Sequence, residues 1–402
     1  MSSRELYIHI GLPKSGTTYL QDALWGSRRA LGKQGALFPG SAPDSQRQGA
    51  WDLLGRRLQG VDQPQVPGSW QRLVESGQRW QGDKVVLSEE FLVHARPRHI
   101  KRIQRDFAPA KMHVVVTVRD LERTIRSMWQ QELAMGRTWT LPEFVAAVRD
   151  PEAGPATAGV RFWLRFDLGR ILGMWESVVP AEQISVVVVP PPGAPAGLLA
   201  ARFTEAIGLE PRTLTLPAQP VNASVGRTEA EVLRRLNVAL GGRLTDRQYA
   251  FLMEHVIRPE LRLSNGSPIR IPDEDLKWAR ERAYELADVL SEGSYRVLGD
   301  PADLIPPASD PVEPGPEHVA DAEIAEAALT ALSATMEHYA KYRAKQVRRN
   351  KGTASPGTKV ASSARAMTFR ARFAVLESAD RNKLASKAAN MYLRRLSKKA
   401  KT

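Results

Sequence analysis

The chain has 402 residues, of which 43% are hydrophobic, and it carries a formal net charge of +13 with no cysteine. This length and apolar content allow a core of its own, in one large domain or in two or three small ones. The absence of cysteine excludes disulfides and cysteine-ligated metal sites, and the 7 histidines include no pair at the i, i+4 spacing of helical zinc sites, so we expect no metal site.

The first predicted element is a short β-rich segment, residues 5–10 (ELYIHI), which ends at Gly11. Residues 17–25 (TTYLQDALW) follow with apolar side chains at helical spacing. A strand, a glycine-containing loop and a helix in this order are typical of an α/β domain. The amino-terminal segment lacks the apolar core of a signal peptide and no run of 18 apolar residues occurs, so we expect a cytoplasmic protein.

Three further buried-type strands are predicted at 84–88 (KVVLS), 112–118 (MHVVVTV) and 184–189 (ISVVVV). The segments between them have helical patterns, notably 121–135, the aromatic stretch 160–178, a helix opened by Thr228 and a last helix at 277–291. Uninterrupted Val-rich strands separated by helices indicate a parallel sheet covered on both faces. His9 and His113 lie within predicted strands, and we expect both to be hydrogen-bonded core residues.

The carboxyl-terminal part differs in composition from the body. A Pro-rich linker is predicted over 306–320, a helix over 321–347 and a basic tail, disordered or amphipathic, over 348–402, all after a main domain of 1–305. Residues 341–402 hold 18 Lys and Arg but 2 Asp and Glu, a net of +16, and the preceding residues hold 39 basic and 42 acidic side chains, a net of −3. A tail of this kind attracts polyanions.

The loop between the first strand and the first helix reads GLPKSGTT over residues 11–18. A glycine-containing turn at a helix N-terminus directs backbone N–H groups at one point, and the helix dipole adds positive potential there. Lys14 adds a charge, and Ser15, Thr17 and Thr18 add hydroxyl groups. The pattern therefore predicts an anion-binding loop.

The identity of the anion follows from the position of Lys14. The loop of nucleoside triphosphatases has its lysine directly after the last glycine, whereas Lys14 precedes Gly16 by two residues. No carboxylate stands at the end of a predicted strand with the freedom to hold magnesium, because Asp120 follows Arg119. Both observations disfavour ATP or GTP bound with a metal.

The segment PKSGTT resembles the 5′-phosphosulfate loop of sulfotransferases that use 3′-phosphoadenosine-5′-phosphosulfate (PAPS). The resemblance implies that Lys14 contacts the transferring sulfuryl group and that the loop holds the 5′-phosphate, through Ser15, Gly16, Thr17 and Thr18. A second family motif, an arginine at a strand end with a serine eight residues later, matches Arg119 and Ser127. The resemblance assigns this pair to the 3′-phosphate, and an arginine fork with a hydroxyl suits that dianion.

The resemblance covers about residues 5–300 and implies a P-loop-like α/β fold: a central parallel sheet flanked by helices, with helical insertions over the acceptor. Carbohydrate-type members use a glutamate after the next strand as the base that deprotonates the acceptor. Glu89 is our first choice for that base, with Glu90 second and His94 third. The segment Asn222-x-Ser224 also resembles such members and is expected near the nucleotide.

The function implied is transfer of a sulfuryl group from PAPS to a hydroxyl of an acceptor, a carbohydrate or glycolipid, with adenosine 3′,5′-bisphosphate as product and no metal required. Two alternatives stay open: a catalytically inactive sulfotransferase-like protein that binds a nucleotide or a partner, and a P-loop kinase. For the tail, we weigh a disordered solubilising extension against reversible attachment to an anionic membrane, at its inner face. Nucleic acid is disfavoured as a partner because few aromatics stand among the basic residues.

Overall fold

The computed structural model describes residues 4–56, 63–152, 154, 155, 157–216, 226–253, 257, 269–306 and 319–352, the last range without the side chains of 346 and 348–352. The chain divides into two compact units, Met1–Ala331 and Leu332–Thr402. The predicted Asn222-x-Ser224 segment, most of the Pro-rich linker and nearly all of the basic tail lie outside the described residues.

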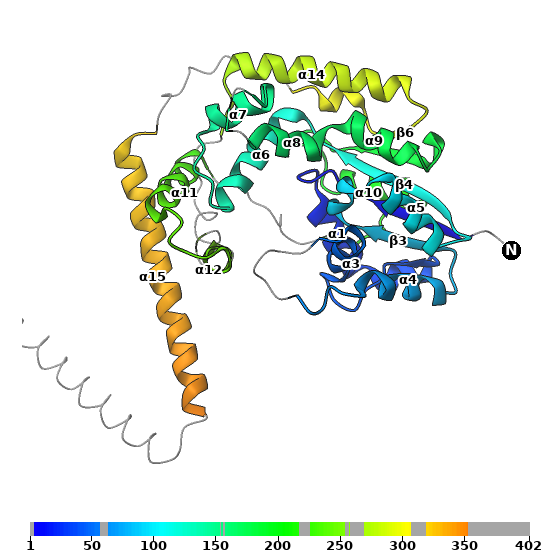
Figure 1. The fold of residues 1–402 in the computed structure, drawn as a ribbon, viewed down its shortest axis with the longest axis horizontal. Helices are drawn as coiled ribbons and strands as arrows, with labels where there is room; N and C mark the ends of the chain where they lie inside the picture. Colours follow the sequence, from blue (N-terminus) through cyan, green and yellow to red (C-terminus); the bar gives the residue numbers. More distant parts are fainter. Residues whose placement is uncertain are drawn as a thin grey trace, which may run out of the picture. The chain divides into compact units, whose positions relative to one another are not determined.

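A central sheet of parallel strands organises the first unit, in the order β2-β3-β1-β4-β5-β6 (Figure 1). The strands are β1 (Glu5–His9), β2 (Ala36–Leu37), β3 (Lys84–Ser88), β4 (Lys111–Val118), β5 (Ile184–Val188) and β6 (Arg296–Leu298). The predicted α/β class with a parallel sheet flanked by helices is confirmed. The two outer strands were not predicted, because two or three residues are too few to show a periodic pattern.

Helices connect the strands and cover both faces of the sheet (Figure 1). They are α1 (Thr17–Gly26), α2 (Arg28–Lys33), α3 (Ser45–Leu54), α4 (Ser69–Arg79), η1 (Glu90–His94), α5 (Pro97–Asp106), α6 (Leu121–Ala134), α7 (Leu141–Arg149), α8 (Ala158–Phe166), α9 (Leu168–Glu176), η2 (Ala181–Gln183), α10 (Leu198–Ala206), α11 (Arg227–Leu240), α12 (Asp246–Leu252), α14 (Asp273–Glu292), η4 (Pro301–Leu304) and α15 (Asp321–Gly352).

Alternate residues of β1, β3, β4 and β5 belong to two different cores, as the period of two in a strand requires. In β1, Leu6 and Ile8 pack into the larger core with helices α3 to α9 and α14, whereas Tyr7 packs into the smaller core with α1, α2 and α10. The continuous apolar strands seen in the sequence are explained by this burial on both faces.

Two local predictions need correction. The aromatic stretch 160–178 forms two helices rather than one, because Asp167 ends α8 and caps α9 by accepting a hydrogen bond from the backbone N–H of Arg170 at 3.0 Å. The helix expected to open at Thr228 begins one residue earlier, at Arg227, with Gly226 as its N-cap and no side-chain cap. Both shifts are local, and Phe162, Phe166 and Trp175 of the aromatic stretch are buried.

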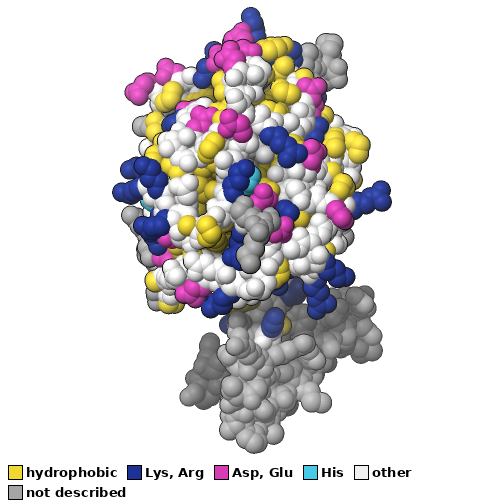
Figure 2. Space-filling view, turned by 90° about the vertical axis from the view of Figure 1, so that its right-hand side faces the viewer, with side chains coloured by type: hydrophobic (Ala, Val, Ile, Leu, Met, Phe, Trp, Pro, Cys, Tyr) yellow, Lys and Arg dark blue, Asp and Glu magenta, His cyan; other side chains and the backbone are white. Residues whose placement is uncertain are grey.

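The helix predicted over 321–347 lies within α15, whose first turns belong to the first unit. Ile324 is buried, and Asp321 forms an ion pair of 2.9 Å with Arg235 of α11. No helix among the described residues is long and apolar enough to cross a membrane. On the face of the molecule shown in Figure 2, basic side chains are scattered among acidic and apolar ones. That mixture agrees with the net charge of −3 that residues 1–340 carry.

Candidate active site

The predicted anion-binding loop lies between β1 and the N-terminus of α1. Three of its residues, Gly11, Lys14 and Gly16, have positive φ angles of 93°, 63° and 86°. Glycine adopts this region freely, but for Lys14 the conformation costs about 1 kcal/mol or more and persists only because its surroundings hold it. When the sign of φ changes between neighbouring residues of a turn, successive backbone N–H groups point toward a common site. Protein loops bind phosphate in this way.

The two loop glycines also leave little room for a side chain. A Cβ atom on Gly16 would stand 2.5 Å from Cδ2 of Leu199 in α10. On Gly11 it would stand 3.1 Å from the backbone nitrogen of Pro13 and 3.3 Å from the Cβ atom of Glu90. The loop is therefore held between α10 on one side and the start of η1 on the other.

Arg119 brings the second predicted motif to the loop. It follows β4, which pairs directly with β1, and its Nη1 atom donates a hydrogen bond of 3.2 Å to the backbone carbonyl of Lys14. Burial lowers the pKa of Arg119 to about 10, aided by the neighbouring Arg123, so it stays cationic at neutral pH. Its buried Nε atom has no hydrogen-bond partner among the described residues. A buried cationic donor without a partner suits a bound phosphate.

Ser127, the other member of that motif, lies two turns into α6 and is half-buried. It is not among the residues that line the cavity beside Arg119, whereas Thr124, one turn earlier on the same helix, is. The hydroxyl of Thr124 donates to the backbone carbonyl of Asp120 at 2.7 Å. The described geometry therefore places Arg119 at the loop but gives no contact for Ser127.

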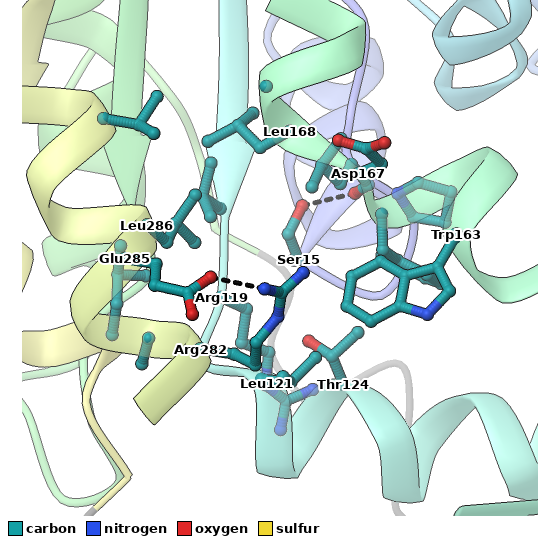
Figure 3. A pocket seen from close by; sticks show the side chains of 18 of the residues that line it. Ser15, Arg119, Leu121, Thr124, Trp163, Asp167, Leu168, Arg282, Glu285 and Leu286 are labelled. Carbon is teal, nitrogen blue, oxygen red and sulfur yellow. Dashed lines mark hydrogen bonds and ion pairs between the residues drawn. The ribbon is translucent and has the colours of Figure 1, made fainter. Parts of the chain in front are cut away.

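A cavity of about 580 Å³ opens beside the loop (Figure 3). Its wall combines the loop and the end of β4 with α6, the α8–α9 junction and α14, and it includes Ser15, Arg119, Thr124, Trp163 and Arg282. Figure 3 shows Arg282 between Glu285, to which it is ion-paired, and Trp163, whose ring centroid lies 5.7 Å from the guanidinium carbon. The volume and the mixture of aromatic and charged walls suit a small ligand.

The hydroxyl groups of the loop are engaged within the protein. Thr17 donates to Oε2 of Glu90 at 2.5 Å, and Ser15 donates to the backbone carbonyl of Leu12. Thr18 is exposed at the start of α1. The hydroxyl groups of Ser15 and Thr17 are therefore already hydrogen-bonded within the protein. For the predicted phosphate contacts, these two residues offer mainly their backbone N–H groups.

Glu89 follows β3 and is 5% exposed. Its side chain caps η1 by accepting a hydrogen bond of 3.3 Å from the backbone N–H of Phe91. Burial raises the pKa of Glu89 to about 7, although the positive charge of Arg47 opposes the rise. A carboxyl group with that pKa exchanges its proton near neutral pH, as a general base must.

The two alternative bases have different surroundings. Glu90 accepts the hydrogen bond from Thr17, so its carboxylate holds the start of α1. His94 ends η1, and burial lowers its pKa to about 4, with Arg56 and Arg165 as further causes. His94 is therefore neutral at physiological pH, and its low pKa makes it a weaker base than Glu89.

Several residues around the site give no signal in the sequence. Trp163, Trp278 and Arg282 reach the cavity from helices that are distant along the chain, and Arg47 acts on Glu89 from α3. His9 is a hydrogen-bonded core residue, as predicted, with ring nitrogens bound to Ser88 and Thr117. The same prediction is wrong for His113, which is half-buried and stacked on Tyr7 with no described hydrogen-bond partner for its Nε2 atom.

Among the residues that the structure describes, no group of three or more His, Asp or Glu side chains could hold a metal ion. No family model matches the chain, and no curated protein matches it. One solved structure with similarity is a sulfotransferase from Alicyclobacillus acidocaldarius, at 13% sequence identity and a TM-score of 0.34, with 63% of this chain and 96% of that chain covered. A likeness of this strength does not assign the chain to a family or an activity.

Proposed function

We propose that this protein is a PAPS-dependent sulfotransferase that sulfates a hydroxyl group of a carbohydrate or glycolipid. The observation that carries the proposal is the hydrogen bond between Arg119 and the carbonyl of Lys14, because it joins the arginine of the second motif, after β4, to the loop that follows the adjacent strand β1. The positive φ angles of the loop and the partnerless Nε atom of Arg119 add support, since both fit a ligand with two separate phosphate groups.

PAPS supplies an activated sulfuryl group when it is bound. On the protein side, the loop around Lys14 and Gly16 binds the 5′-phosphate end through backbone N–H groups and the lysine charge. Arg119 holds the 3′-phosphate with a charge that is already desolvated and oriented, so little reorganisation is needed on binding. Ser127 is proposed to assist Arg119 through its hydroxyl group.

Glu89 is the proposed general base. Its carboxylate takes the proton of the acceptor hydroxyl, which makes the acceptor oxygen a better nucleophile, while the ammonium group of Lys14 stabilises the negative charge that grows on the leaving phosphate oxygen. Because the pKa of Glu89 is raised to about 7, the group is ionised in a large part of the molecules at neutral pH and is still basic. No metal has a role in this mechanism.

The test uses isothermal titration calorimetry of the full chain with adenosine 3′,5′-bisphosphate, adenosine 5′-monophosphate and ATP. We expect the bisphosphate to bind best, and Arg119→Ala to weaken the bisphosphate much more than the monophosphate, because the lost contact is to the 3′-phosphate. Binding of ATP alone, or equal loss for both adenosine ligands in Arg119→Ala, would overturn the proposal. Incubation with labelled PAPS and a lipid and sugar extract then identifies the acceptor.

The basic tail is proposed to bind anionic membrane surfaces, which would bring the enzyme to a glycolipid acceptor. Residues 383–399 carry six Lys and Arg side chains beside Leu384, Met391 and Tyr392 at spacings that a single helix face would share. Each basic side chain at an anionic surface contributes about 1 kcal/mol. The net charge of +16 over 341–402 gives the proposal its basis.

A further inference from the structure

Four buried polar side chains form a continuous chain beneath the anion-binding loop. They come from three neighbouring strands and from the loop itself: Ser88 at the end of β3, His9 at the end of β1, Thr117 near the end of β4, and Ser15. Each is at most 1% exposed. Buried polar groups are rare unless they are fully paired, and a connected set has a defined geometry.

The contacts follow from the sheet register. His9 lies opposite Ser88 on one side and Val115 on the other, so Ser88, His9 and Thr117 project from the same face of the sheet. The Nδ1 atom of His9 is 2.7 Å from Oγ of Ser88, and its Nε2 atom is 3.1 Å from Oγ1 of Thr117. Thr117 Oγ1 is 2.5 Å from Oγ of Ser15, which in turn contacts the carbonyl of Leu12.

The direction of every hydrogen bond in this chain can be assigned. Ser15 has one hydroxyl proton and donates it to the carbonyl of Leu12, so Thr117 must donate to Ser15. Thr117 then accepts from Nε2–H of His9, and Ser88 donates to Nδ1. Of the two neutral tautomers of His9, only the one protonated at Nε2 satisfies all four bonds. Burial, which lowers the pKa of His9 to about 3, keeps the ring neutral.

These hydrogen-bonded side chains connect the strand end that bears Glu89 with the anion-binding loop. Ser88 directly precedes Glu89, whose backbone N–H donates to the carbonyl of His9 at 3.0 Å. At the other end, Ser15 stands between Lys14 and Gly16 in the loop. The ring of His9 is packed edge-on against Phe203 of α10, with centroids 5.0 Å apart, so it cannot rotate freely. The imidazole of His9 is thus one of the links between the strand end that bears Glu89 and the loop, beside the hydrogen bond from Thr17 to Glu90.

We propose that His9 is a positioning residue, which fixes the conformation of the anion-binding loop through Thr117 and Ser15 and its register to the strand end that bears Glu89. The expected effect of His9 on nucleotide binding rests on the proposed function. The expected effect of His9 on the loop conformation holds with or without a ligand. His9 itself touches neither the nucleotide nor the acceptor and acts only through the two hydroxyl groups.

Two matched pairs of variants test the proposal. His9→Phe keeps the ring packed on Phe203 but removes both hydrogen bonds, whereas His9→Gln retains a donor in place of the Nε2–H group. Thr117→Val removes the hydroxyl at nearly constant volume, and Thr117→Ser keeps it. For each variant we measure amide hydrogen exchange of the ligand-free loop, exchange of the sheet as a whole, and the affinity for adenosine 3′,5′-bisphosphate.

We expect His9→Phe and Thr117→Val to raise exchange in residues 11–16 selectively and to weaken nucleotide binding about tenfold, the equivalent of one lost hydrogen bond. His9→Gln and Thr117→Ser should stay within about threefold of the wild type, because the bond to the loop survives. The proposal would be overturned if amide exchange of the loop in His9→Phe equalled that of the wild type. It would also be overturned if exchange increased equally over the whole sheet, because that indicates a merely structural role. If His9→Phe does not fold, the Thr117 pair decides. If the wild type binds no nucleotide, the proposed function fails while loop exchange still decides the role of His9.

Discussion

Replacing Glu89 by glutamine should change the free energy of unfolding by an amount that depends on pH. In the folded protein, burial raises the pKa of Glu89 from 4.5 to about 7. An acid whose folded pKa lies above its unfolded pKa binds its proton more tightly when folded. Its contribution to stability is therefore fully present below about pH 4.5 and is lost as the pH rises through about 7.

The magnitude follows from linkage. A shift of about 2.5 pKa units corresponds to about 3 kcal/mol at 1.36 kcal/mol per unit. Glutamine resembles the protonated carboxyl group but does not ionise, so it escapes this loss. Relative to the wild type, Glu89→Gln should gain about 3 kcal/mol between about pH 4 and about pH 8.

Urea unfolding of both proteins across that pH range measures the difference, with the slope of free energy against urea as a check that the unfolded state is unchanged. Glu231 supplies a control of opposite sign. Burial alone would raise the pKa of Glu231, but hydrogen bonds from Arg234 and Arg235 outweigh it and lower the pKa. Glu231→Gln should therefore lose stability relative to the wild type as the pH rises. A free-energy difference for Glu89→Gln that does not change with pH would refute the reasoning.

Four further outcomes follow from the site. Lys14→Ala should abolish sulfuryl transfer yet keep part of the nucleotide affinity, because the backbone donors of the loop remain; unchanged turnover of labelled PAPS would contradict this. Arg119→Ala should weaken adenosine 3′,5′-bisphosphate by tenfold or more in calorimetry, since a charge-assisted hydrogen bond contributes about 1.5–3 kcal/mol. Gly16→Ala should lower the stability by about 1 kcal/mol or more, because φ is 86° and the added Cβ atom meets α10 at 2.5 Å; Gly173→Ala, in open space within α9, is its control and should not unfold at lower urea. Deletion of residues 348–402 should abolish flotation with vesicles that contain anionic lipid, and equal flotation of both proteins would end the membrane proposal.

The fold was predictable because its signals are local. Runs of valine such as those of β4 and β5 mark strands buried on both faces, and the loop between 11 and 16 is recognisable from its glycines and its place before a helix. The candidate site was predictable only in part. In the sequence, the loop and Arg119 were linked only through the family resemblance, and the pairing of β1 with β4 brings them together in the structure. The aromatic and charged wall supplied by α14 has no pattern in the sequence that points to the cavity.

By itself, the sequence determined the element types, the parallel arrangement of the sheet, and the positions of Lys14 in the loop after the first strand and of Arg119 at a strand end, since periodicity and turn chemistry act over a few residues. Only the tertiary structure decided that Glu89 is buried with its pKa raised to about 7, and that His9 spans Ser88 and Thr117. Those properties depend on which distant segments exclude water from a group and which donors they bring within hydrogen-bond distance. Neither quantity is encoded in the spacing of residues along the chain.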